Sequence, residues 1–133
     1  MAFFGKTYVL EKNENLEEFL TAIGVPAEMI QGALKATPSL KVTKDGDTYT
    51  LTATDEKTKD VKFVSGVELE EQVTSDIVAK KTITVEGNVI TQVQNFSNNR
   101  ILTTKREFKE NSVLVTMTAN NWDGVCHRYY TAV

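Results

Sequence analysis

Short stretches of alternating apolar and polar residues, separated by turn signals, fill most of this 133-residue chain. Asp45-Gly46 and Glu86-Gly87-Asn88 each stand between two such stretches, a pattern that indicates β-hairpins. With an opening strand over residues 5–12, we expect about ten strands, and their regular spacing favours an all-β barrel or sandwich. An antiparallel barrel of about ten strands is wide enough to enclose a small ligand. The length suits a single domain over residues 1–133.

The helical signal is confined to residues 15–36. The i, i+3, i+4, i+7 spacing of one helix face is met by Leu16, Phe19, Leu20 and Ile23. Asn15 is placed to cap this helix, with Glu18 as its capping-box partner, and Gly24 is placed to end it. A second apolar face follows Pro26, so we expect helices at about 15–24 and 26–36. This helix-turn-helix would bury its apolar faces by covering an open end of the barrel as a lid.

Charge and composition restrict the class of partner. The net charge of −3 argues against nucleic acid, because phosphate binding needs a basic surface. No apolar stretch approaches the ~20 residues of a membrane-spanning helix, and the first residues do not resemble a secretory signal. Cys126 is the single cysteine, which excludes an internal disulfide and suits a reducing compartment. We therefore expect a cytoplasmic protein.

The sequence offers no catalytic or metal-binding constellation. Cys126 and His127 are neighbours on a predicted strand, so their side chains face opposite sides and cannot form a nucleophile-base pair. A single His and a single Cys also give no cluster with recognised metal-ligand spacing. We expect neither enzymatic activity nor a metal or cofactor.

Two predicted strands carry an arginine on a largely apolar face. In the last strand, Arg128 and Tyr130 share a face, about 7 Å apart along the strand. In an earlier strand, Arg106 shares its face with Leu102 and Phe108. An arginine keeps its proton at neutral pH even when it is buried, so an enclosed one needs an anionic partner. A ligand carboxylate could accept hydrogen bonds from both guanidinium groups and from the Tyr130 hydroxyl.

The spacing alone leaves a second interpretation open. Arg106 could pair with an interior Asp or Glu while Arg128 faces solvent, in a structural or protein-interaction β-domain without a sizeable cavity. The sequence shows no abundance of acidic residues on the faces of these arginines, which favours a ligand as the partner. Lys80-Lys81 is expected to be a solvated strand end.

Five motifs follow one another along the chain at consistent spacing. They are Phe4-Gly5-Lys6-x-Tyr8-x-Leu10, Asn15-Leu16-Glu17-Glu18-Phe19-Leu20-x-x-Ile23-Gly24, Gly46-Asp47, Phe63-x-x-Gly66-Val67-Glu68 and Cys126-x-Arg128-x-Tyr130. Together they resemble the intracellular lipid-binding proteins, the group of fatty-acid-binding and cellular retinoid-binding proteins. The similarity to lepidopteran fatty-acid binders is closest in Asn121-Trp122-Asp123-Gly124-Val125 and Arg128-Tyr129-Tyr130.

The resemblance implies a ten-stranded antiparallel β-barrel of the calycin type, a β-clam with a helix-turn-helix lid and an internal cavity. Matched position by position, it assigns Arg106, Arg128 and Tyr130 to the ligand carboxylate. It assigns lid or cavity-wall positions to Phe19, Leu20, Ile23, Met29, Ala33, Pro38, Val115 and Met117. The implied function is a non-catalytic, monomeric carrier of one or more long-chain fatty acids. The same Arg/Arg/Tyr trio would serve a carrier of another carboxylated lipid, such as retinoic acid.

Two features bear on how such a carrier would load and unload. Glu56 stands at the turn between the third and fourth strands, where many relatives carry a bulky Phe that guards the entrance to the cavity. The resemblance therefore does not predict how this entrance is gated or which chain length is preferred. The predicted lid exposes Glu17, Glu18 and Glu28, and an acidic surface does not favour docking on anionic membranes. We expect membrane contact to be transient at most.

Overall fold

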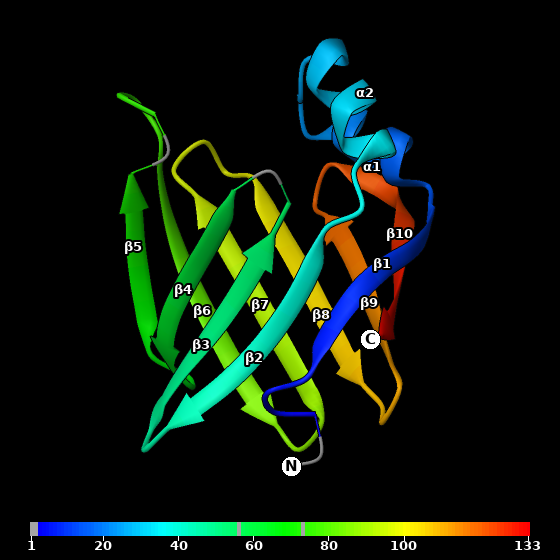
Figure 1. Cartoon of the computed structure of the whole chain (residues 1–133). Helices are drawn as coiled ribbons and strands as arrows, with labels where there is room; N and C mark the ends of the chain where they lie inside the picture. The colour runs from blue at the N-terminus through cyan, green and yellow to red at the C-terminus, as the bar shows by residue number, and fades with distance from the viewer. Residues whose placement is uncertain (1–2, 56, 73) are drawn as a thin grey trace.

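The computed structural model describes residues 3–55, 57–72 and 74–133. Over these residues the chain forms ten strands and two helices (Figure 1). In chain order they are β1 (Thr7–Glu14), α1 (Leu16–Ala22), α2 (Ala27–Lys35), β2 (Ser39–Asp45), β3 (Thr48–Thr54), β4 (Thr58–Val64), β5 (Glu68–Gln72), β6 (Val78–Glu86), β7 (Val89–Phe96), β8 (Ile101–Phe108), β9 (Ser112–Ala119) and β10 (Trp122–Ala132). The predicted all-β fold with a two-helix insertion is confirmed.

The described strands form one antiparallel sheet in the order β4-β3-β2-β1-β10-β9-β8-β7-β6-β5. β1 pairs with both β2 and β10, which joins the first and last parts of the chain. β4 and β5 are the outer strands, and the described residues form no ladder between them. The backbone N–H of Gly66, in the turn between them, donates to the carbonyl of Ile83 on β6 at 2.9 Å. The sheet therefore curls into a nearly closed barrel (Figure 1).

The hairpins predicted from turn residues are confirmed. β2 and β3 pair continuously up to Asp45 and Thr48, around Gly46, whose φ is 63°. β6 and β7 pair in the same way up to Glu86 and Val89, around Gly87 with φ 62°. Positive φ is costly for residues with a Cβ, which is why glycine holds these two turn positions.

The N-terminus and the turn between β8 and β9 lie at the end of the barrel away from the helices (Figure 1), and three aromatic residues of these parts of the chain pack together. Phe3 stacks on Phe108 with ring centroids 4.4 Å apart, and Tyr8 meets Phe108 edge to face at 5.8 Å. All three residues are buried. They belong to the main core cluster, which also contains Val42 and Val113. The same cluster also contains Leu40, Leu51, Val115 and Tyr130, so the core extends along the inside of the barrel.

Helix α1 covers the other end and packs against β10. Leu16 and Phe19 are buried in a second cluster with Cys126, and Phe19 meets Trp122 edge to face at 5.7 Å. The predicted capping box is wrong: Asn15 has a left-handed backbone (φ 61°) and makes no side-chain cap. Its amide instead donates to the backbone oxygen of Val125 at 3.0 Å and ties the start of the helix to β10.

Helix α2 packs more loosely than α1. Ile30 is its buried residue, while Met29 is 63% exposed. Both helices are confirmed, but each is shorter than the expected 15–24 and 26–36. Within the described residues, neither helix has the length and apolarity needed to cross a membrane.

Candidate functional site

A cavity of about 280 Å³ lies between two walls of the barrel, near the lower end of the range for small-molecule pockets. One wall, from β2 and β3 and the residue before β2, contributes Pro38, Ser39, Leu40, Leu51 and Ala53. The other wall, from β7 to β10, contributes Gln92, Gln94, Thr104, Arg106, Val115, Met117, Arg128 and Tyr130. The first wall is mainly apolar and the second carries most of the hydrogen-bonding groups, so a bound molecule would meet two chemically different surfaces.

The strand register brings the two predicted arginines together. Arg106 on β8 lies opposite Val115 on β9, and Val115 lies opposite Arg128 on β10. Directly opposite residues of an antiparallel pair share one face. The three residues therefore form one row on the inner wall, with the arginine backbones two strand spacings, roughly 10 Å, apart. Tyr130 is the next residue of β10 on this face, and it also lines the cavity.

Arg106 is a partly buried charged group on the wall of the cavity. Its Nη1 donates to Oε1 of Gln92 at 3.3 Å. Burial lowers the pKa of Arg106 to about 10; the neighbouring Tyr130 raises it and Arg128 lowers it. The guanidinium therefore stays protonated at neutral pH and keeps donors that a bound anion could occupy.

Arg128 and Tyr130 complete the polar end of the cavity. Nε of Arg128 donates to Oδ1 of Asn13 at 2.9 Å, and its guanidinium carbon lies 5.8 Å from the centroid of the Tyr130 ring. Burial raises the pKa of Tyr130, while Arg128 and Arg106 lower it and Cys126 raises it. Tyr130 thus keeps its proton at neutral pH and can act as a donor.

Neither cavity arginine has an acidic partner in the described part of the chain. No carboxylate oxygen there lies within 4.0 Å of either guanidinium, and both ion pairs that the structure shows are made by lysines. Gln92 and Asn13, the partners of Arg106 and Arg128, are neutral. The alternative in which Arg106 pairs with an interior acid is therefore not what this structure shows.

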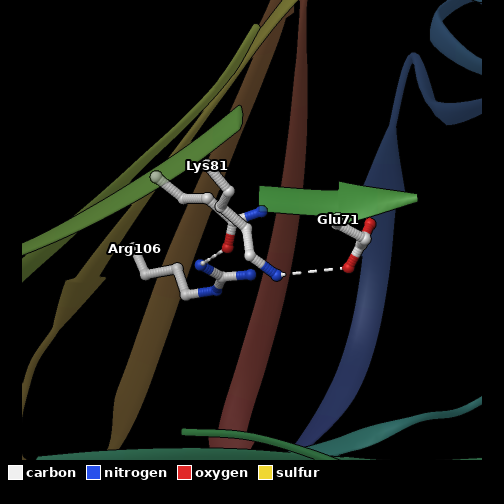
Figure 2. Close-up of polar contacts among 4 residues, drawn as sticks. Glu71, Lys81 and Arg106 are labelled. Carbon is white, nitrogen blue, oxygen red and sulfur yellow. Dashed lines mark hydrogen bonds and ion pairs between the residues drawn. The ribbon is translucent and has the colours of Figure 1, made fainter. Parts of the chain in front are cut away.

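The prediction that Lys81 belongs to a solvated strand end is wrong. Lys81 is 7% exposed, on the inner face of β6, and its Nζ lies 3.6 Å from Oε2 of Glu71 on β5 (Figure 2). Lys80 is exposed, as expected for a solvated residue. Ala79, Lys81 and Ile83 are all buried and alternate along β6, so they share one face of the strand. The sequence contains this alternation, but the neighbouring Lys80 makes Lys81 look like part of a charged, solvated segment.

The remaining predicted wall residues divide between the cavity and the lid. Pro38, Val115 and Met117 line the cavity. Phe19 is buried under the lid, and Leu20 and Ile23 pack partly against the same cluster. Ala33 is half-buried and Met29 is exposed; neither lines the cavity. Glu56, in the turn between β3 and β4 for which no gating of the cavity entrance is predicted, lies outside the described residues.

Cys126 packs under the lid. Its side chain is buried, and burial raises its pKa to about 11, so the thiol stays protonated and packs as a small apolar group. His127 lies opposite Thr116, on the other face of β10. The described residues contain no group of three or more His, Cys, Asp or Glu side chains placed to hold a metal ion.

The curled antiparallel barrel, the helical lid and the polar-ended cavity define a β-barrel of the small-molecule-binding class. The model of the "Lipocalin / cytosolic fatty-acid binding protein family" matches residues 1–123, and the chain belongs to this family. It is 40% identical over 133 residues to fatty acid-binding protein 1 of Manduca sexta, covering 99% of this chain and 100% of that protein. Fatty acid-binding protein 2 of the same species is 38% identical over 135 residues, covering 99% of this chain and 100% of that protein.

Solved structures agree with this assignment. The fatty-acid-binding protein isolated from Manduca sexta superimposes with a TM-score of 0.88 at 37% identity, over 98% of this chain and 99% of that one. The fatty acid-binding protein of Drosophila melanogaster brain superimposes with a TM-score of 0.87 at 37% identity, over the same shares. The expected β-clam and the resemblance read from the five motifs are both confirmed.

Proposed function

We propose that this protein is a non-catalytic carrier that holds a long-chain fatty acid in the barrel cavity. The carboxylate binds Arg106, Arg128 and Tyr130, and the hydrocarbon tail lies along the apolar wall. The relatives named above are fatty acid-binding proteins, which supports this class of ligand. We expect the carrier to work as a monomer in the cytoplasm.

One observation carries the proposal. Two positively charged guanidinium groups face one cavity, and within the described residues neither has a carboxylate within 4.0 Å. Removing a charge from water costs several kcal/mol unless an opposite charge compensates it. A ligand carboxylate supplies that charge and accepts charge-assisted hydrogen bonds from both groups. The Tyr130 hydroxyl provides a further donor.

The tail supplies most of the binding free energy in this account. Burial of each methylene is worth roughly 0.8 kcal/mol, so a C16 tail could contribute about 12 kcal/mol at the upper bound. Loss of translational and rotational freedom removes at least ~4 kcal/mol. Leu40, Leu51 and Met117 give the tail an apolar surface. The arginines then select an acid over a neutral lipid, and they determine that the carboxylate end of the ligand lies in the interior of the barrel.

Loading requires the lid to move, because the helices cover the end of the barrel nearer the cavity. Helix α2 is the expected moving part, since Ile30 alone of its described residues is buried. It is joined to α1 through Gly24, whose φ is 87°. The exposed Glu17, Glu18 and Glu28 favour transfer through solution, with at most transient membrane contact.

Native mass spectrometry of freshly purified protein, followed by lipid extraction, tests the proposal. We expect a complex with one or more C16–C18 fatty acids, and saturation of delipidated protein by added oleic acid. A co-purifying retinoid such as retinoic acid would support the alternative carboxylated ligand. Delipidated, folded protein that binds no fatty acid at saturating concentration would contradict the proposal.

A further inference from the structure

We propose that Lys81 and Glu71, on the inner face of β6 and β5 next to the cavity, form a second binding site, which takes a hydroxyl group on the ligand's chain. The preferred ligand is then a long-chain fatty acid hydroxylated at an internal carbon. This inference rests on the proposed function, because the carboxylate must first be held at Arg106, Arg128 and Tyr130. We call the two residues the Lys81–Glu71 pair.

The register places the Lys81–Glu71 pair on the inner wall. Lys81 lies directly opposite Gln94 of β7, and Gln94 lines the cavity. Residues opposite each other in an antiparallel pair share a face, so Lys81 faces the same interior. Glu71 on β5 lies opposite the fully buried Ala79 of β6, which puts it on this face too. Figure 2 shows Lys81, Glu71 and Arg106 projecting into the barrel interior from three different strands.

The geometry of the pair lets one hydroxyl oxygen, lying beside it, reach both residues. Nζ of Lys81 and Oε2 of Glu71 are 3.6 Å apart, longer than a hydrogen bond between these groups. Among the described residues, the ammonium makes no hydrogen bond of 3.5 Å or less, although Lys81 is only 7% exposed. Because no fully buried side-chain nitrogen in the described part of the chain lacks a hydrogen-bond partner, Nζ is reached by solvent in the ligand-free protein, and it has donors that a ligand group would occupy.

A hydroxyl matches this arrangement better than other ligand groups. An ammonium can only donate hydrogen bonds and an ionised carboxylate can only accept them. A hydroxyl accepts from Lys81 and donates to Glu71 at the same time. A second carboxylate on the ligand would be repelled by Glu71, and an unsubstituted methylene chain would leave the ammonium donors unoccupied.

The pair also continues a line of polar side chains that begins at the carboxylate site. Arg106 donates to Gln92, and Gln94, the next inward residue of β7, lies opposite Lys81. Across the cavity, Leu40 and Leu51 present apolar surface. A fatty acid with its carboxylate at Arg106 would therefore lie with one side of its chain along Gln92, Gln94 and Lys81. An internal hydroxyl on that side would reach the pair.

The first test uses the unmodified protein and a positional series of monohydroxy-octadecanoic acids, with octadecanoic acid as reference. Dissociation constants are measured by displacement of a fluorescent fatty acid. We expect an isomer with an internal hydroxyl to bind about tenfold more tightly than the 2-hydroxy and 18-hydroxy isomers, as one hydrogen-bonded site predicts. Hydroxylation that weakens binding at every internal position would overturn the inference.

The second test changes Lys81 and a matched neighbour. Lys81→Met keeps a long side chain but removes the ammonium, and it should cost the preferred isomer about tenfold in affinity. Octadecanoic acid itself should change by less than about threefold. Lys80→Met, on the outer face of the same strand, should change neither value. Equal loss for both ligands in Lys81→Met would overturn the inference.

The proposed function and the role of the Lys81–Glu71 pair can each be disproved separately. If octadecanoic acid does not bind the folded, unmodified protein, the proposed function is wrong. If it binds but no internal isomer is preferred, only the role of the Lys81–Glu71 pair is wrong. Should Lys81→Met not fold, as judged by circular dichroism, the positional series on the unmodified protein still decides the question.

Discussion

Arg106 and Arg128 lie on either side of Val115, in one cross-strand row that spans β8, β9 and β10. The row faces the cavity, and each guanidinium is hydrogen bonded to a neutral side chain. Two like charges in one row destabilise each other unless an anion lies between them. This relationship underlies our proposal that the interior of the barrel binds an acid.

Replacement of Arg128 by leucine should weaken binding of a long-chain fatty acid by about 2–5 kcal/mol, the usual cost of breaking a buried, hydrogen-bonded charge pair. The matching long-chain alcohol lacks the charge and should lose much less. Isothermal titration calorimetry with both ligands measures the difference. Lys105→Leu, on the solvent face of β8, is the control. Equal losses for acid and alcohol would show that Arg128 does not hold the carboxylate.

Arg106→Met should stabilise the ligand-free protein while weakening its binding of the acid. Burial lowers the pKa of Arg106 well below its ordinary value, to about 10, so keeping the guanidinium charged at neutral pH costs the folded state free energy. The shift in pKa corresponds to a destabilisation of the folded state by at most about 3 kcal/mol. Arg106→Met removes this destabilisation but also removes the hydrogen bond to Gln92, which is worth about 1 kcal/mol. Urea unfolding at pH 7 should therefore show a gain of about 1–2 kcal/mol. A loss of stability would contradict this account.

The affinity for a fatty acid should fall as the pH rises above about 10, through the pKa of Arg106 in the ligand-free protein. A bound carboxylate favours the protonated guanidinium, so binding and proton uptake are coupled. Between about pH 7 and pH 10 Arg106 and the carboxylate are both charged, and the affinity should stay level. The matching alcohol serves as the control, because its binding has no charge to couple. An acid whose affinity is unchanged up to pH 11, in protein shown to be folded, would argue against the role of Arg106.

Phe19 should be the main anchor of the lid. It is 1% exposed and packs against Trp122, and truncation of such a residue costs about 3–5 kcal/mol. Phe19→Ala should therefore lower the free energy of unfolding by this amount in a urea titration. Met29→Ala, at a position 63% exposed on α2, should change it by less than about 0.5 kcal/mol. Similar losses for both variants would mean that α2 is held as firmly as α1.

Local patterns predicted the elements of the fold well. The hairpins at Gly46 and Gly87 follow from turn chemistry, and the inward direction of Arg106 follows from period-2 alternation. The resemblance to relatives then implied the lid and the cavity. Asn15 shows the limit of local rules, because its side-chain amide donates to the backbone oxygen of Val125 on β10, which is far away in the sequence. The break between β4 and β5 was not predicted for the same reason, since pairing is decided across the sheet.

The candidate site was predicted only in part. Arg106, Arg128 and Tyr130 line the cavity, but their neighbours Asn13, Gln92 and Gln94 were not anticipated. Polar residues of this kind occur on both faces of exposed strands, so only the register shows which of them point inward. Lys81 and Glu71 were missed because adjacent charges suggest a solvated strand. Their inward direction depends on which strands β6 pairs with.

The most direct test of the central claim is a ¹³C NMR titration of a fatty acid labelled at its carboxyl carbon and bound to the protein. A carboxylate held by two guanidinium groups has its pKa lowered by about 1–3 units, and burial keeps it from bulk water. The carboxyl resonance should therefore not shift between pH 8 and pH 4 in the unmodified protein, and it should begin to titrate in this range in Arg128→Leu. A resonance that titrates like an exposed carboxyl group in the unmodified protein would contradict the claim that Arg106, Arg128 and Tyr130 bind the head group.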